Sequence, residues 1–419
     1  MQVTNFLFRR CWNALLLVVV LLVSGGWVVV ERMGNGPLVA ALCLVLLGGF
    51  LGSARIPKSV DGLFMLTVAV LFAVSYLQDM TIDDKELFVI LKACIAMAAC
   101  VHFSRLGIDF RELFVDVMYY TSIVSLILYP LAWAAPRLAI HIGGEYGTLF
   151  GLLYVRTSDI QRFGHYRNQG FFWEAGVYGV MLSLAYIYNA LIYRRRRGWV
   201  LLLTALTTAS MGALAILMPM AGFLYVYARQ PRIATALAVA ALLAGGGVVS
   251  VPGLAGSALS VLTGRDLKND SSITVRLNDL TLGLRAASDS LMLGRPSDDL
   301  DAYNALALSE YGYVKINDSG ISNSITSLVY KYGVPLTLMY LLTLASRMRR
   351  DFGKLALVVF PAVCGLLMVE PLGVSIFLFM LLAYRPPRKF ALMATVTAPP
   401  SMANENPGAI TLHPHSPTV

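Results

Sequence analysis

Residues 9–30 read RRCWNALLLVVVLLVSGGWVVV, in which two arginines precede 20 residues that carry no charge. A helix of about 20 apolar residues is long enough to cross the hydrocarbon core of a bilayer. A basic start followed by an apolar run also resembles a signal peptide. However, Ser24-Gly25-Gly26-Trp27 offers no A-x-A cleavage site, so we expect a retained membrane anchor.

The same alternation of basic clusters and apolar runs continues to Lys389. It predicts an all-α fold, a polytopic transmembrane helix bundle of about 12 spans. Thr207, Thr208, Ser210 and Gly212 favour a tight break between two of these spans over one long helix. The expected spans lie near 13–30, 37–54, 61–78, 87–104, 113–133, 171–193, 198–209, 211–228, 233–251, 324–345, 355–370 and 372–384.

The composition agrees with this class of protein. Hydrophobic residues make up 57% of the 419 residues and charged residues only 14%, whereas soluble domains carry about 25% charged residues. The net charge of +9 is explained by basic loops beside the spans, which argues against nucleic-acid binding. All five cysteines lie in or beside apolar runs, so we expect neither a disulfide nor a metal cluster in the long loops.

The basic clusters also predict the orientation. If the N-terminus is cytoplasmic, the cytoplasmic loops hold 19 of the 33 Lys and Arg residues, and the short outer loops hold only Arg32 and Lys85. This follows the positive-inside rule and makes both termini cytoplasmic. We expect a membrane domain over 1–390 and a disordered tail, rich in Pro, Ser, Asn and Thr, over 391–419. The cytoplasmic set is Arg9, Arg10, Arg55, Lys58, Arg105, Arg111, Arg194, Arg195, Arg196, Arg197, Arg229, Arg232, Arg347, Arg349, Arg350, Lys354, Arg385, Arg388 and Lys389.

Two long polar loops, 134–170 and 252–323, lie on the outer side and are expected to contain short amphipathic helices. The first has more basic than acidic residues, and its arginines are Arg137, Arg156, Arg162 and Arg167. Guanidinium groups suit bidentate binding of phosphate. Arg167 is followed by Glu174, expected about one turn into a helix. A simpler interpretation is that Arg167 reaches lipid phosphates and Glu174 caps the helix dipole.

In the second loop, apolar residues recur at helical spacing between Ile273 and Leu293, which predicts an amphipathic helix across the outer face. Arg276 begins it, and Gly294-Arg295-Pro296 ends it. The alternative is a lid in which these arginines pair with nearby acids, as Arg285 could with Asp289 four residues later. The apolar positions are Leu277, Leu280, Leu284, Ala287 and Leu291.

An apolar bundle with arginines at its outer mouth suits a lipid-linked diphosphate. The polyprenyl chain would stay in the bilayer while Arg held the diphosphate and stabilised its charge as a leaving group. The two loops contain no Asp-x-Asp metal motif, so Arg would replace a divalent ion. A carboxylate or imidazole would take the proton from an acceptor hydroxyl.

The chain resembles the O-antigen polymerase and O-antigen ligase superfamily of bacterial inner-membrane glycosyltransferases over most of residues 10–385. Four short, degenerate stretches carry the resemblance, in the family's order. They are Arg167-x-x-Gly170-x-Phe172-x-Glu174, the helix break from Leu203 to Gly212, Ser272 to Arg276 with Gly294, and Asn323 to Gly333.

Two positions depart from the family. Met211 stands where an Arg often follows the helix break, and Ser322 stands where ligases carry a His before Asn323. These departures favour a polymerase over a ligase and leave the catalytic base open. Glu174 is the first candidate and His165 the second; Asp318 is weaker. Glu370 is weaker too, because we expect an acid directly before Pro371 to be a solvated residue of a turn.

We therefore expect a polysaccharide polymerase for O-antigen, capsule or exopolysaccharide. It would transfer a growing glycan from polyprenyl diphosphate to a lipid-linked repeat unit, on the periplasmic side of the bacterial inner membrane. The resemblance implies an inverting reaction without metal or other cofactor. Arg167 and Arg276 would bind diphosphate with help from Arg162, Arg285 and Arg295, and Gly170, Asn323 and Tyr330 would contact other parts of the substrate.

The expected partners are a polyprenyl-diphosphate-linked oligosaccharide and membrane lipid, with a chain-length regulator and a flippase as candidates. An O-antigen ligase, a transporter or flippase of lipid-linked or anionic sugars, and a non-catalytic scaffold are the alternatives. A transporter should carry charges deep in its spans or paired repeats with broken helices.

Overall fold

The computed structural model describes residues 2–24, 60–79, 84–143, 146–163, 166–195, 197–230, 271–295, 300–311 and 321–385. These residues are mostly helical, and they include five helices long and apolar enough to cross a membrane. The expected spans 37–54 and 233–251 and the expected tail 391–419 lie outside the described residues. The number of twelve spans therefore stays a prediction.

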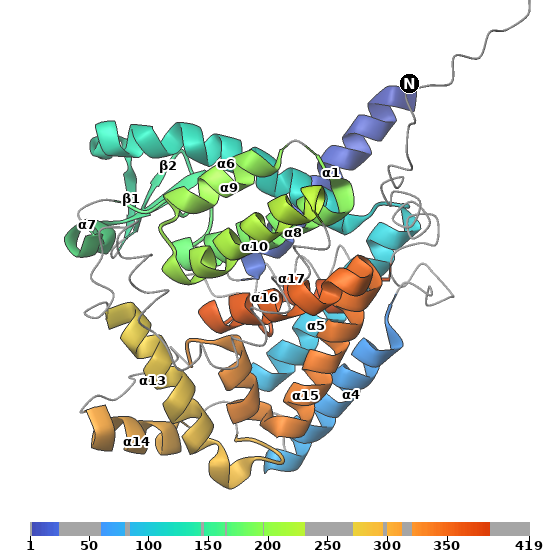
Figure 1. The fold of residues 1–419 in the computed structure, drawn as a ribbon, viewed down its shortest axis with the longest axis vertical. Coiled ribbons are helices and arrows are strands. Elements are labelled where there is room, and N and C mark those ends of the chain that lie inside the picture. Colours follow the sequence, from blue (N-terminus) through green and yellow to red (C-terminus); the bar gives the residue numbers. More distant parts are fainter. Residues whose placement is uncertain are drawn as a thin grey trace, which may run out of the picture. The chain divides into compact units, whose positions relative to one another are not determined.

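The helices of the apolar part follow the expected spans closely (Figure 1). They are α1 (Gln2–Val23), α4 (Gly62–Asp79), α5 (Asp84–Arg105), α6 (Phe110–Ala134), α8 (Ala175–Tyr188) with its π-helical continuation η2 (Asn189–Tyr193), α9 (Gly198–Thr207), α10 (Met211–Arg229), α15 (Ser324–Phe352), η4 (Gly353–Leu355), α16 (Ala356–Val369) and α17 (Ile376–Ala383).

The predicted break between α9 and α10 is confirmed. Thr207 and Thr208 each donate a side-chain hydrogen bond of 2.7 Å to a carbonyl three residues earlier. Ala209 then has a positive φ of 47°, which ends the first helix because a left-handed residue cannot continue a right-handed one. The backbone N–H of Ser210 binds Thr208 Oγ1, and α10 begins at Met211.

The first long loop corrects the expectation of an all-α fold. It contains η1 (Pro136–Leu138), the strands β1 (Ile140–Gly143), β2 (Tyr146–Leu149) and β3 (Leu153–Arg156), and the helix α7 (Thr157–Phe163). The strands form an antiparallel sheet in the order β1-β2-β3. Short apolar runs separated by glycine-containing turns, as around Gly143 and Gly151, are typical of hairpins.

The second long loop contains α13 (Ser271–Ala286), η3 (Ser288–Ser290) and α14 (Asp301–Tyr311). The expected helix exists, but it is shorter than predicted, and of the predicted apolar row Ala287 is fully buried. Leu282 and Ala286 are buried among α14 and the start of α15, whereas Leu284 and Leu291 are exposed. The buried face of α13 includes the carboxylate of Asp279, which accepts hydrogen bonds from Tyr303 Oη and the Ser322 N–H.

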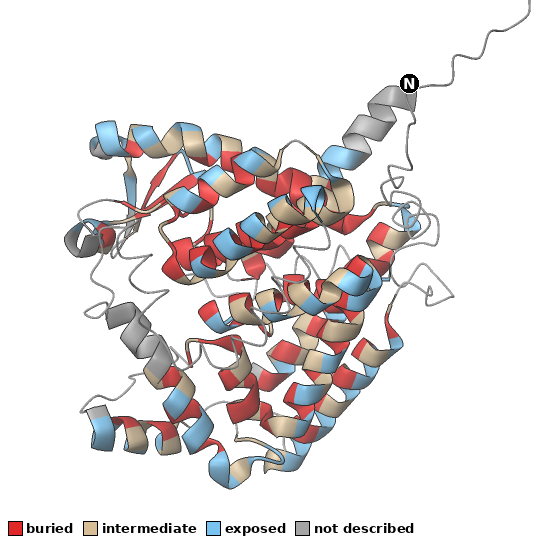
Figure 2. Cartoon of the chain, in the orientation of Figure 1, coloured by how far each residue is buried: buried red, intermediate tan, exposed pale blue. Residues whose placement is uncertain are grey.

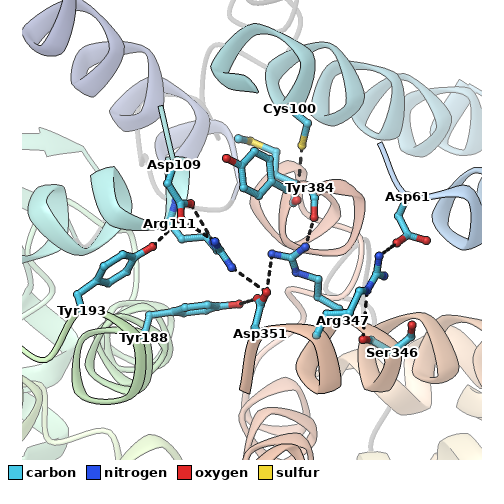
Figure 3. A network of polar contacts seen from close by, with 12 residues as sticks. Asp61, Cys100, Asp109, Arg111, Tyr188, Tyr193, Ser346, Arg347, Asp351 and Tyr384 are labelled. Carbon is cyan, nitrogen blue, oxygen red and sulfur yellow. Dashed lines mark hydrogen bonds and ion pairs between the residues drawn. The ribbon is translucent and has the colours of Figure 1, made fainter. Parts of the chain in front are cut away.

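The helix ends that carry the basic clusters meet at one end, here called the basic end. Arg10 of α1 and Arg195 after η2 both pair with Asp116 near the start of α6. Arg350 of α15 pairs with Asp61 before α4. Figure 3 shows Asp351 of α15 at the centre of a further group, where it binds Arg111, Arg347 and Tyr188, the residues that link α6, α15 and α8.

The opposite ends of the same helices form the loop end, where both long loops attach. The helix α8, which begins there, is buried along nearly its whole length (Figure 2). It packs closely on the α9–α10 break, because a Cβ atom at Gly179 would lie 2.9 Å from Ala213 Cβ. The short helix α17 is also fully buried. These two helices form the apolar centre that positions the loop end.

Candidate functional site

The four stretches that carry the family resemblance meet in two pairs. The backbone N–H and side-chain amide of Asn168 bind the carbonyl (3.1 Å) and Oγ1 (2.9 Å) of Thr207, which joins the first stretch to the helix break. Gly294 packs against the backbone just before Gly333, and Gly333 packs against the backbone just before Gly294. Both glycines have positive φ angles, 77° and 76°. This contact joins the third stretch to the fourth.

Arg167, the first candidate for diphosphate binding, is paired within its own loop. Its Nη2 and Nε lie 2.9 and 3.0 Å from Asp159 Oδ1 on α7. The other oxygen of Asp159 accepts a 3.1 Å hydrogen bond from Gln169. The Asp159 carboxylate is almost fully buried, so it holds the guanidinium group in a fixed position at the edge of the loop.

Gly170 occupies a position that a larger residue could not take. Its φ is 55°, and a Cβ atom there would lie 2.8 Å from the ring of Tyr178. The ring of Phe172 stacks on the other side of this contact, 5.3 Å from the Tyr178 ring centroid. Gly170 therefore lets the chain turn tightly over α8, and its role in the structure is a backbone one.

Glu174 does not lie one turn inside a helix, as the sequence had predicted. It is the N-cap residue of α8, with φ −140° and ψ 140°, and its side chain makes no capping hydrogen bond. The tight turn at Gly170 delays the start of the helix to Ala175. The partly exposed carboxylate lies at the positive end of the helix dipole, where an anion is stabilised.

Glu370 is a buried residue, so its interpretation as a solvated turn acid was wrong. It follows α16 directly, and its side chain is only 2% exposed. Its carboxylate lies against Gly176 in the first turn of α8, where any Cβ atom would overlap Glu370 Oε1. The Glu370 carbonyl accepts a 2.6 Å hydrogen bond from Ser324 Oγ at the start of α15. Two carboxylates, Glu174 and Glu370, thus lie at the N-terminus of α8.

A pocket opens between the start of α15, the turn after Glu370 and α5. It measures about 340 Å³ with its solvent-open mouth, and Lys331 is its cationic side chain. An ammonium group in such a place favours an anion beside it. The pocket is lined by Val89, Ser324, Ser327, Leu328, Lys331, Tyr332, Pro371, Gly373 and Val374.

The candidate residues of the second loop have structural partners. Arg285 pairs with Glu310 of α14 at 2.5 Å and not with Asp289, because α13 ends at Ala286 before the helical spacing reaches residue 289. Arg295 donates its Nε–H to the Ala286 carbonyl at 3.3 Å and its backbone N–H to the Tyr330 carbonyl at 2.8 Å. The loop is therefore tied to both α13 and α15.

Two further candidates of the fourth stretch also serve the fold. Asn323 caps α15 by accepting a 2.7 Å hydrogen bond from the Thr326 N–H. Tyr330 is buried in the cluster under α13 and α14. His165 and Asp318, and the side chains of Arg162 and Arg276, lie outside the described part of the chain, so their roles stay predictions.

Sequence reasoning missed Lys331 and the two serines of the pocket. Ser324, Ser327 and Lys331 recur at steps of three and four, so they share one helical face, and this signal was available in the sequence. The family pattern directed attention to Asn323 and Gly333 instead. Among the residues that the structure describes, no group of three or more His, Cys, Asp and Glu side chains could hold a metal ion.

A comparison of the chain with models of known protein families finds no match. A comparison with curated proteins finds no significant match either.

Proposed function

We propose that the chain is a polysaccharide polymerase of the bacterial inner membrane that uses polyprenyl-diphosphate-linked glycans on the outer side. The observation that supports this most is that the turn after the buried acid Glu370 lines a pocket that also contains Lys331, at the loop end of the spans. An enzyme for this reaction needs a cationic group for the diphosphate and a base for the acceptor hydroxyl within one site.

In this proposal, Arg167 binds the diphosphate of the donor, as the resemblance implies, and Lys331 is a further anion-binding side chain. The charge on that group grows as the glycosidic bond breaks, and fixed cations stabilise it best when they need not move. The pair with Asp159 gives Arg167 such a fixed position. Arg276 remains a diphosphate-binding candidate beside Arg167, and Arg162, Arg285 and Arg295 remain helpers, as in the sequence-based prediction.

Glu370 replaces Glu174 as the first candidate for the general base. Its carboxylate is buried against Gly176 of α8, and its backbone carbonyl is held by the hydrogen bond from Ser324 Oγ. Glu174, at the exposed edge of the same helix end, would contact the incoming sugar. His165 remains a candidate from the sequence alone. The inverting, metal-independent course of the reaction rests on the family resemblance.

The decisive experiment is reconstitution of the purified protein in proteoliposomes with a lipid-linked repeat unit. We expect a ladder of products on a gel, and we expect Glu370→Gln, Lys331→Gln and Arg167→Ala to reduce its formation at least 100-fold. Lys354→Gln is the matched control, because Lys354 is an exposed lysine near the basic end. This variant should make a normal ladder.

A wild-type protein that makes no ladder, or a ladder unchanged in all three variants, would contradict the proposal. Product transferred once to a lipid A acceptor would instead identify a ligase. A transporter is tested by deleting the gene: loss of a polymerase leaves single repeat units on the cell surface, whereas loss of a flippase traps them inside.

A further inference from the structure

The turn between β2 and β3 exposes large apolar side chains in a strained conformation. Phe150 has a φ of 54° and Gly151 one of 69°. A left-handed conformation is uncommon for a residue as bulky as Phe. The side chains of Phe150 and Leu152 are 65% and 53% exposed. In water, this turn would combine backbone strain with exposed apolar surface, so the turn needs an apolar surrounding to explain it.

The turn lies beside a membrane span and not beyond its end. Leu149 and Leu153, the residues on either side of it, are fully buried in one cluster with Ala132 of α6. Leu128 and Leu131 of α6 pack against the same cluster. These residues belong to the last two turns of α6, within the candidate span Phe110–Ala134. The first outer loop therefore folds back along the helix from which it emerges.

The same part of α6 has the features of a lipid-facing surface near the membrane interface. Ile127 and Trp133 are 67% and 54% exposed there, and Trp is typical of the interfacial belt. Basic residues of the loop lie close in sequence: Arg137 is exposed after α6, and Arg156 of β3 stacks over the ring of Tyr146. Arginines beside an apolar tip suit lipid headgroups beside acyl chains.

We propose that the 150–152 turn inserts Phe150 and Leu152 into the acyl region of the outer lipid leaflet. The first long loop would then be anchored in the membrane at its hairpin. The anchor would act on the candidate site, because the Tyr154 N–H donates a 2.7 Å hydrogen bond to the Gly170 carbonyl. It would hold the 166–170 segment at a constant depth relative to the membrane surface. This inference does not depend on the reaction that the protein catalyses.

The test places an environment-sensitive fluorescent label on Phe150→Cys or Leu152→Cys in a chain whose five native cysteines are replaced by alanine. The protein is reconstituted in phosphatidylethanolamine and phosphatidylglycerol vesicles, with nitroxide-labelled lipids or iodide as quenchers. Ile127→Cys is the lipid-facing reference, and Ser309→Cys, on an exposed position of α14, is the water-facing one.

We expect labels at 150 and 152 to be quenched by nitroxide lipids to within twofold of the label at 127, and by iodide several-fold less than the label at 309. Iodide quenching equal to that at 309 would overturn the proposal. Protection from both quenchers that varies with the protein-to-lipid ratio would also overturn it, because it would identify a second copy of the chain as the occupant.

A second variant tests the anchoring itself. Phe150→Asp places a charge on the tip, and the Leu152→Cys label in this background should become several-fold more accessible to iodide. An unchanged melting temperature in detergent would show that the variant still folds. A label at 152 that stayed in the lipid despite the Asp would contradict the role of Phe150.

Discussion

At the scale of single residues, the contact between Gly176 and Glu370 sets the shape of the candidate site. Glycine in a helix costs about 1 kcal/mol relative to alanine, yet alanine at position 176 would overlap Glu370 Oε1. The carboxylate therefore lies where a side chain of α8 would otherwise be. Because Ser324 also holds the Glu370 carbonyl, the backbone at this residue cannot shift freely to relieve an overlap.

We predict that Gly176→Ala lowers the free energy of unfolding in detergent by about 1–3 kcal/mol, the usual cost of overpacking a buried position. In a Glu370→Ala background the same substitution should cost nothing or become stabilising, since the overlapping atoms are gone and the helix gains alanine. Thermal unfolding of the four proteins of this double-mutant cycle measures the coupling. Equal costs in both backgrounds would show that the two residues do not touch.

The residues of the site could be predicted only in part. Gly170 was identified from the sequence, but for its substrate role rather than for the turn that its positive φ allows. An acid before a proline looks the same whether it is solvated or buried, so the sequence could not place Glu370 on α8. Lys331 was overlooked although it shares a helical face with Ser324 and Ser327, because Gly373, which lines the pocket with it, is distant in sequence.

At the scale of elements, α13 shows why apolar periodicity alone does not identify the buried face of a helix in this protein. The predicted apolar row is divided between the two environments: Leu284 is exposed and Ala287 is buried, while Leu282, outside the row, is fully buried with Tyr303 of α14. In a soluble protein an apolar stripe faces the core. Beside a bilayer a second apolar face is tolerated, so periodicity alone could not choose between them. The Thr- and Ser-rich α9–α10 break was predictable because its signal is local.

We predict that Leu282→Ala lowers the free energy of unfolding by about 2–5 kcal/mol, the range for emptying a buried leucine position. The same change at Leu284, two residues later on the exposed face, should cost less than about 0.5 kcal/mol. Unfolding of both variants in the same detergent gives the comparison. A larger loss at Leu284 would mean that the originally predicted face is the buried one.

At the scale of the whole molecule, the gathering of basic clusters at one end was predictable, because it follows from the charge bias of the loops. The pairing of these basic residues with buried carboxylates was not predictable, because the partners are far apart in sequence. Arg111 alone binds Asp109 and, 240 residues later, Asp351. Burial alone would raise the pKa of Asp109, which lies just before α6, but the Arg111 guanidinium outweighs this and holds that pKa below its usual value.

Asp351 connects α6, α8 and α15 through buried groups and therefore gives a sharp test of the basic end. Its carboxylate accepts hydrogen bonds from Arg111 Nη1 at 2.7 Å and Tyr188 Oη at 3.2 Å, and it lies 2.9 Å from Arg347 Nη2 in an ion pair. Removing one partner of a buried ion pair costs about 3–5 kcal/mol, because the remaining charge is left without compensation. We predict a loss of this size for Asp351→Ala in the free energy of unfolding.

A second substitution distinguishes charge compensation from simple loss of packing, because the two predict stability changes of opposite sign. Arg347 is fully buried, so replacing it with methionine in the Asp351→Ala background removes an uncompensated charge and keeps most of the volume. The double variant should be more stable than Asp351→Ala alone, although two side chains have been changed. Asp289→Ala, on an exposed acid of η3, serves as the control and should unfold like the wild type. If the losses in free energy of unfolding caused by Asp351→Ala and Arg347→Met instead add up in the double variant, packing stabilises the basic end. Its ion pairs then contribute only specificity.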